Sequence, residues 1–265
     1  MAADEKSMPF LKNLASSDRK IRTSALGTLR TFLSASTTSR ALTPLDNLKL
    51  WKGLFYSLYM CDRPVPQQNL CADLAALLDV LPDDAVAPWL VGFWDVMGRE
   101  WTTGIDVLRM EKFLLLVRRV LGRSLVWAHE VPKAKGAKGK KAADARRAAL
   151  LELFREWPFE STGDLKKMPV GLRLHVLDIW VDEAEKAGMI GEDSTEADAE
   201  FLNGIREILQ AMIGKTVTPV KPRAKESLAD ERLPWYEKKE GTEAEDEEMT
   251  EDGDSDRDSF GGFDD

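Results

Sequence analysis

The residues of this sequence that could carry chemistry are mainly cationic. One basic segment holds lysines and arginines at Lys133, Lys135, Lys138, Lys140, Lys141, Arg146 and Arg147. Such side chains can neutralise RNA phosphates and release counterions. The same pattern can also direct nuclear import. The residues leave both functions open, together with a solvated linker that binds nothing.

A second cationic group follows from helical spacing. On a helix expected over residues 105–127, four side chains fall within about 80° of one another at 100° per residue. They are Arg109, Lys112, Arg119 and Arg123. The pattern predicts a basic ridge that contacts phosphate or an acidic partner, and the alternative is an ordinary solvated face.

An enzymatic site finds little support. His129 and His175 lie in different segments, without a Cys, Asp or Glu at metal-ligand spacing. Gly136 and Gly139 fall in a lysine tract with no preceding strand, which argues against a phosphate-binding loop. We therefore expect no catalytic residue, no metal and no cofactor, and a protein that is not an enzyme.

A small apolar cluster interrupts the charged C-terminal part of the chain. It consists of Leu233, Pro234, Trp235 and Tyr236. These residues have no core of their own, so they must dock either onto the helices or onto another protein. We favour a partner and expect an extended docking arm over residues 215–239.

Charge is unevenly distributed along the chain. Residues 240–265 hold thirteen acidic residues and one arginine, which gives this segment a net charge of −12. Because the whole chain carries −9, the rest of it carries +3. This segment predicts a disordered acidic tail that either keeps the protein soluble or binds basic proteins transiently.

The elements that position these residues are predicted to be helices. Apolar residues recur at helical spacing through residues 1–214, and strand-like alternation is absent from the sequence. Residues 132–141 lack core residues, which indicates a mobile basic loop. The pattern favours an all-α fold of stacked antiparallel helix pairs, loosely similar to HEAT or armadillo solenoids.

Compartment signals are simple. No apolar run approaches the roughly 18 residues that span a bilayer, and the N-terminus lacks the apolar region of a signal peptide. Cys61 and Cys71 are expected to be reduced core thiols. A protein of the cell interior without a membrane partner is predicted.

Three blocks of sequence resemble a known family. The first is Leu50–Tyr56 followed by Asp62-Arg63-Pro64, the second runs from Phe93 to Phe113, and the third contains Gly171-Leu172, His175 and Asp178-Ile179. Together they resemble the eukaryotic nucleolar family of ribosomal RNA-processing protein 1. The family signature falls on Trp51, Lys52, Gly53, Phe55, Asp62, Pro64, Arg99, Trp101, Gly104 and Asp106, for which we expect a structural role.

The resemblance implies a process rather than a reaction. It implies a non-catalytic assembly factor of the large (60S) ribosomal subunit, located in the nucleolus and required for pre-rRNA processing. The implied partners are other assembly factors and ribosomal proteins of the pre-60S particle, with pre-rRNA as a further candidate and no small-molecule substrate. The alternative is a helical-solenoid adaptor or chaperone that binds basic cargo proteins through its acidic tail.

Overall fold

The computed structural model describes residues 10–131, 136–160 and 162–236, which are helical and contain no strand. The elements are α1 Leu11–Leu14, α2 Arg19–Ser34, α3 Ser36–Arg40, α4 Pro44–Tyr59, α5 Pro64–Ala75, η2 Ala76–Val80, α6 Asp83–Glu100, η3 Val107–Arg109, α7 Met110–His129, α8 Ala137–Glu156, α9 Val170–Lys186, α10 Glu196–Lys215 and α11 Val220–Leu228. The predicted acidic tail lies outside the described residues.

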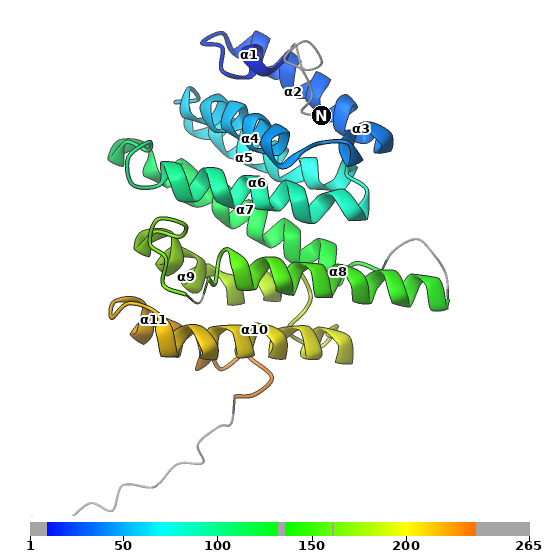
Figure 1. Cartoon of the computed structure of the whole chain (residues 1–265), viewed down its shortest axis with the longest axis vertical. Coiled ribbons are helices and arrows are strands. Elements are labelled where there is room, and N and C mark those ends of the chain that lie inside the picture. Colours follow the sequence, from blue (N-terminus) through cyan, green and yellow to red (C-terminus); the bar gives the residue numbers. More distant parts are fainter. Residues whose placement is uncertain (1–9, 132–135, 161, 237–265) are drawn as a thin grey trace, which may run out of the picture.

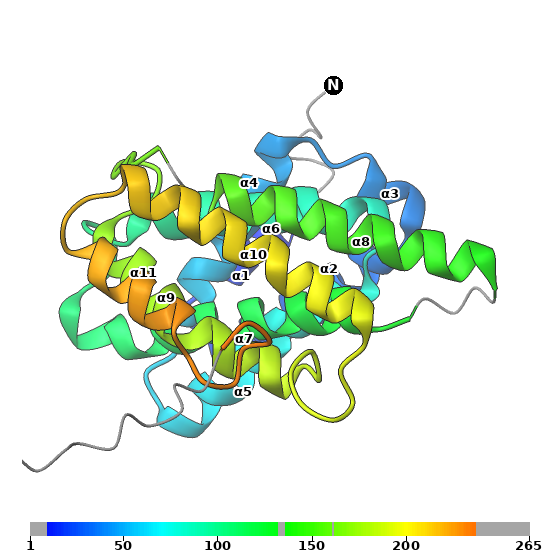
Figure 2. The ribbon, with the colours of Figure 1, turned by 90° about the horizontal axis from the view of Figure 1, so that it is seen from below.

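The helices stack in two layers. One layer contains α4, α6, α8 and α10, each packed on the next, and the other contains α5, α7, α9 and α11 (Figure 1). Figure 2 views the stack from below, where α10 and α11 lie side by side at its end. This arrangement confirms the predicted all-α solenoid of helix pairs.

Local sequence fixes where the helices begin. Thr43 and Asp46 form a capping box, since Thr43 Oγ1 accepts from Asp46 N at 3.2 Å and Asp46 Oδ2 accepts from Thr43 N at 3.0 Å. Pro44 then takes the first helical position, where its missing N–H costs nothing. Pro64 likewise begins α5, whereas α4 ends at Tyr59.

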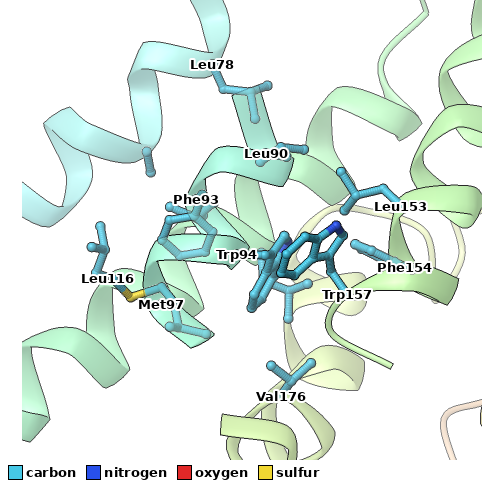
Figure 3. Close-up of a cluster of buried hydrophobic side chains, with 14 of the residues drawn as sticks. Leu78, Leu90, Phe93, Trp94, Met97, Leu116, Leu153, Phe154, Trp157 and Val176 are labelled. Atoms are coloured by element: carbon cyan, nitrogen blue, oxygen red, sulfur yellow. The ribbon is translucent and has the colours of Figure 1, made fainter. Parts of the chain in front are cut away.

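The core is continuous from layer to layer and is rich in aromatic side chains. Figure 3 shows Phe93, Trp94 and Met97 of α6 facing residues of α7, α8 and α9. Each of these three side chains is almost completely buried. Burial of such large apolar surfaces is the main favourable term in folding, so this cluster holds the middle helices α6 to α9 together.

Two predicted boundaries within the helical part are wrong. The apolar helix begins at Met110 rather than Ile105, because the turn η3 precedes it. The predicted mobile loop is wrong for residues 137–141, which form the start of α8. Lysine and alanine are good helix formers, and burial of Ala143 anchors the extended helix. Lys133 and Lys135 lie outside the described residues.

The predicted extended arm is also wrong over its first part. Val220–Leu228 forms α11, which packs on α9 and α10. Val220 and Ala224, four residues apart, are both completely buried, so one helix face supplies the contact. The sequence did not predict this short helix, because Pro222 argued against a helix there. Proline is nevertheless tolerated in the first turn of a helix.

Candidate interaction surface

The three signature blocks meet in the folded chain. Trp51 packs against Trp89 and Phe93 with ring centroids 4.9 Å apart in both pairs, and its Nε1 donates to Trp89 O at 2.9 Å. Phe55 stacks on Phe113 at 4.7 Å. The first block is therefore joined to the second through a buried aromatic cluster, in which offset and edge contacts add to area burial.

The third block joins the second through His175. Its ring stacks on Trp101 at 6.5 Å, and its Nε2 lies 3.0 Å from Leu114 O. Burial lowers the pKa of His175 below its ordinary value. A neutral imidazole held between an indole and a carbonyl is a structural contact.

A polar contact links the middle of α4 to the end of α6. Lys52 forms an ion pair with Glu100. A Cβ atom on Gly104 would overlap Oε2 of Glu100, so glycine leaves room for this carboxylate. Gly53 is similarly tight, because an added Cβ would lie 3.2 Å from Leu14 Cδ1.

Two neighbouring turns are braced against each other by Lys112 and Arg109, which both contact the signature residue Asp62. Lys112 Nζ donates to Tyr59 O at 2.8 Å, to Cys61 O at 3.0 Å and to Asp62 Oδ1 at 3.3 Å. Arg109 lies over the Tyr59 ring at 4.7 Å and pairs with Asp62 at 3.8 Å. The α4–α5 turn and the η3 turn are thus fixed relative to each other.

Asp106 sets the η3 turn itself. Its Oδ1 accepts from Leu108 N at 2.9 Å, and its carboxylate pairs with Arg109 at 3.5 Å. Arg99 instead pairs with Asp95, one turn earlier on α6. The capped turn is a rigid support for the two residues at its tip.

Apolar side chains project from these braced turns. Val107 is 81% exposed and Leu108 is 89% exposed. Met60 and Val65, at the neighbouring α4–α5 turn, are 45% and 65% exposed. We call these four residues the turn patch. Sequence reasoning missed it, although an apolar pair placed between a capping Asp and a helix start was a usable signal.

The predicted basic ridge on α7 does not exist as one exposed surface. Lys112 is buried, and Arg109 is held by the carboxylates described above. Arg123 pairs with Asp79 and, at 3.8 Å, with Glu130. Of the four ridge residues, only Arg119 is exposed and forms no ion pair with any residue that the structure describes. A helical wheel gives angles on one helix and cannot show which neighbours cover it.

The basic segment divides in a similar way. Lys138, Lys140 and Lys141 are exposed on α8 and form no ion pair with any residue that the structure describes. Arg146 pairs with Asp83 at 2.7 Å and lies over the Trp127 ring at 5.4 Å. Its neighbour Arg147 contacts Asp198 at 3.5 Å. The two arginines therefore brace α8, and among the described residues of the segment the three lysines remain accessible to a ligand.

The C-terminal cluster folds back onto the helices. Leu233 is buried, Trp235 Nε1 donates to Leu228 O at 2.9 Å, and Arg206 lies over the Trp235 ring at 5.1 Å. The prediction that a partner receives this whole cluster is wrong for these two side chains. Pro234 and Tyr236 remain exposed.

The described residues hold no group of three or more His, Cys, Asp or Glu side chains that could bind a metal ion. Among those residues, no helix is both long enough and apolar enough to cross a membrane. Cys61 and Cys71 are free and buried, and burial raises the pKa of Cys71 to about 12. That thiol is therefore protonated near neutral pH, in line with a structural role.

Comparison with known proteins gives one consistent result. The family model described as "Nucleolar protein, Nop52" matches residues 5–261. The human protein named ribosomal RNA processing protein 1 homolog B is 34% identical over 182 residues, which cover 68% of this chain and 22% of that protein. The mouse homolog A is 32% identical over 200 residues, covering 74% of this chain and 38% of that protein.

A more distant relative carries the same printed name. The Dictyostelium discoideum ribosomal RNA processing protein 1 homolog is 28% identical over 187 residues, which cover 66% of this chain and 36% of that protein. The chain thus spans well under half the length of these curated relatives. The family match agrees with the resemblance read from the signature blocks and with the predicted nucleolar assignment. This chain belongs to the Nop52 family of nucleolar proteins.

Proposed function

We propose that the protein is a non-catalytic assembly factor of the large ribosomal subunit, which holds pre-60S components together while pre-rRNA is processed. The relatives' names supply the process. The turn patch is the observation that carries the mechanism, because its apolar side chains stand on turns braced by signature residues. A rigid apolar projection suits a pocket on a partner protein, where buried side chains supply most binding energy.

The partners of this surface are other assembly factors or ribosomal proteins of the pre-60S particle. Lys138, Lys140 and Lys141 are the proposed contacts to pre-rRNA or to an import receptor, since they carry unpaired charge on an exposed helix start. The protein supplies position and no reaction.

The test replaces both tip residues in the full chain, Val107→Ser and Leu108→Ser. A tagged variant is sedimented from nuclear extract with and without ribonuclease, and the RNA that travels with it is sequenced. We expect the wild type to migrate with large-subunit precursor RNA and the double variant to remain near the top of the gradient. Both proteins should melt at the same temperature, because the replaced side chains bury almost nothing.

Val131→Ser is the matched control, because Val131 is also exposed, at 76%, but lies at the far end of α7. It should migrate like the wild type. Sedimentation of the double variant with the particle would refute a role for the turn patch. A wild-type chain found only in a small complex free of RNA would favour the adaptor for basic cargo instead.

A further inference from the structure

A pocket of about 210 Å³ lies at the N-terminal end of the stack, between α2, α4 and α5 (Figure 1). Its polar lining includes Arg19, Arg22, Ser57 and Asn69. At about 30 Å³ for each water molecule, it has room for about seven waters. Of the residues in the turn contacts described above, only Cys61 also lines this pocket.

Arg22 is the unusual member of the lining. It is only 7% exposed, yet no carboxylate of the described residues pairs with it. Its Nη1 donates to Ser16 O and Ser17 O, both at 2.8 Å. The guanidinium carries five N–H donors, so those on Nε and Nη2 have no partner in the described part of the chain. Neither nitrogen is among the described side-chain atoms that are closed off from solvent, so both can donate to an anion that enters the pocket.

Other groups of the pocket point to the same ligand chemistry. Ser57 is 2% exposed, and its hydroxyl makes no hydrogen bond to any residue that the structure describes. Arg19 supplies a second, exposed cation. Leu26 and Leu70 give the pocket an apolar side that suits an aliphatic stem.

We propose that this pocket binds the carboxylate of a glutamate or aspartate side chain presented by an acidic peptide segment. Arg19 and Arg22 carry two positive charges against one negative charge on Asp73, which also lines the pocket. The resulting single positive charge matches one carboxylate. Arg22 is only 7% exposed and Leu26 and Leu70 form one side of the pocket, which suits a single carboxylate on an aliphatic stem, whereas a nucleic acid places its phosphates along an open basic surface.

The peptide can come from a partner protein or from this chain. Residues 240–265 and residues 1–9 contain acidic side chains and lie outside the described residues. The proposal concerns the site and stands independently of the proposed function, because neither the turn patch nor the pre-60S particle enters it.

The experiment measures binding of a fluorescent peptide, EAEDEEMTED, to the full chain by anisotropy. In one form of the protein, every acidic residue of segments 1–9 and 240–265 is replaced by its amide. We expect this form to bind the peptide. Its affinity for a control peptide, in which every Glu and Asp is replaced by Gln or Asn, should be at least about tenfold lower. Tighter peptide binding to this form than to the wild type identifies the chain's own segments as the natural ligand. Equal binding identifies a partner protein as the source.

Arg19→Gln tests the pocket without disturbing the buried Arg22, and Ser57→Ala tests it from a second helix. We expect Arg19→Gln to weaken binding about fivefold or more, while Arg30→Gln on the same helix leaves binding unchanged because Arg30 lies outside the pocket. Absence of peptide binding, or equal weakening by Arg30→Gln, would overturn the proposal. Single-stranded RNA is tested as a competitor. If RNA displaces the peptide and Arg19→Gln also weakens RNA binding, the site binds phosphate rather than a carboxylate.

Discussion

At the scale of single residues, buried charges in this protein act as braces. Lys112 gathers three acceptors from the α4–α5 turn, and Arg173 gathers acceptors from the loop before α9. Each charge satisfies backbone carbonyls that would otherwise be buried without donors. Removing such a group leaves these acceptors unpaired, which costs more than the contact itself is worth.

Lys112→Met should therefore destabilise the protein by about 1–3 kcal/mol, because Tyr59 O loses its side-chain donor in a part-buried site and Cys61 O keeps only its side-chain bond from Gln67. Arg119→Met is the control, since Arg119 is exposed on the same helix, and its effect should stay within about 0.5 kcal/mol. Urea denaturation followed by circular dichroism measures both. A Lys112 variant as stable as the control would show that the brace contributes nothing.

Glu160 gives a prediction for pH. Burial by itself raises the pKa of this carboxyl, but hydrogen bonds from Thr162 and Arg173 outweigh burial and hold the pKa below its ordinary value. A carboxylate with a lowered pKa stabilises the fold above the pKa of the unfolded chain, about 4.3, and the stabilisation disappears as the pH falls through the folded value.

Glu160→Gln should accordingly be less stable than the wild type at pH 7. The difference in unfolding free energy between the two proteins should shrink as the pH is lowered below about 4. Denaturant titrations from pH 7 to pH 3 measure it. A difference that stays constant over this range would mean that ionisation of Glu160 does not stabilise the fold.

At the scale of elements, the C-terminal segment belongs to the solenoid. Arg232 pairs with Asp182 at 3.0 Å and with Glu185 at 2.7 Å, both on α9. Arg118 of α7 shares Asp182 at 2.6 Å, so one carboxylate links α7, α9 and the residues after α11. Together with Leu233 and Trp235, these pairs fasten the end of the described chain.

Trp235→Ala should lower stability by about 1–3 kcal/mol, because it removes the packed indole, its hydrogen bond to Leu228 O and the contact with Arg206. Tyr236→Ala should change stability by less than about 0.5 kcal/mol, since that side chain is 43% exposed. Thermal melts compare the two. Equal melting temperatures for Trp235→Ala and the wild type would show that Trp235 does not stabilise the fold and would favour its predicted contact with a partner.

At the scale of the whole molecule, each helix pair of the stack packs mainly on the pairs next to it. The middle helix pairs, α6 with α7 and α8 with α9, are covered on both sides, whereas α2 and α11 lie at the ends of the stack (Figure 1). In such solenoids stability is distributed along the stack, and end layers open more easily.

Hydrogen exchange followed by mass spectrometry should show this gradient. We expect backbone amides of α6 and α7 to exchange most slowly and those of α2 and α11 to exchange faster. Peptides from the middle helices provide the internal reference. Uniform protection from α2 to α11 would instead indicate a single cooperative unit.

Much of the architecture followed from the sequence alone. Apolar residues at helical spacing predicted the α4, α6 and α10 helices, since periodicity determines which face is buried. The signature tryptophans Trp51 and Trp101 were expected to have a structural role, and both are buried in the core. The signature blocks identified the family before any contact between the blocks was known.

The tertiary structure decided which charges are free. Spacing placed Lys112 and Arg123 on one face of a helix, but neighbouring helices bury the first and pair the second. The tertiary structure also decided that Leu233 and Trp235 pack against the core and that Val107 and Leu108 do not. All four are apolar residues in short connecting segments. Periodicity is a property of one helix, whereas exposure and pairing depend on residues distant in sequence, and only the folded chain brings these together.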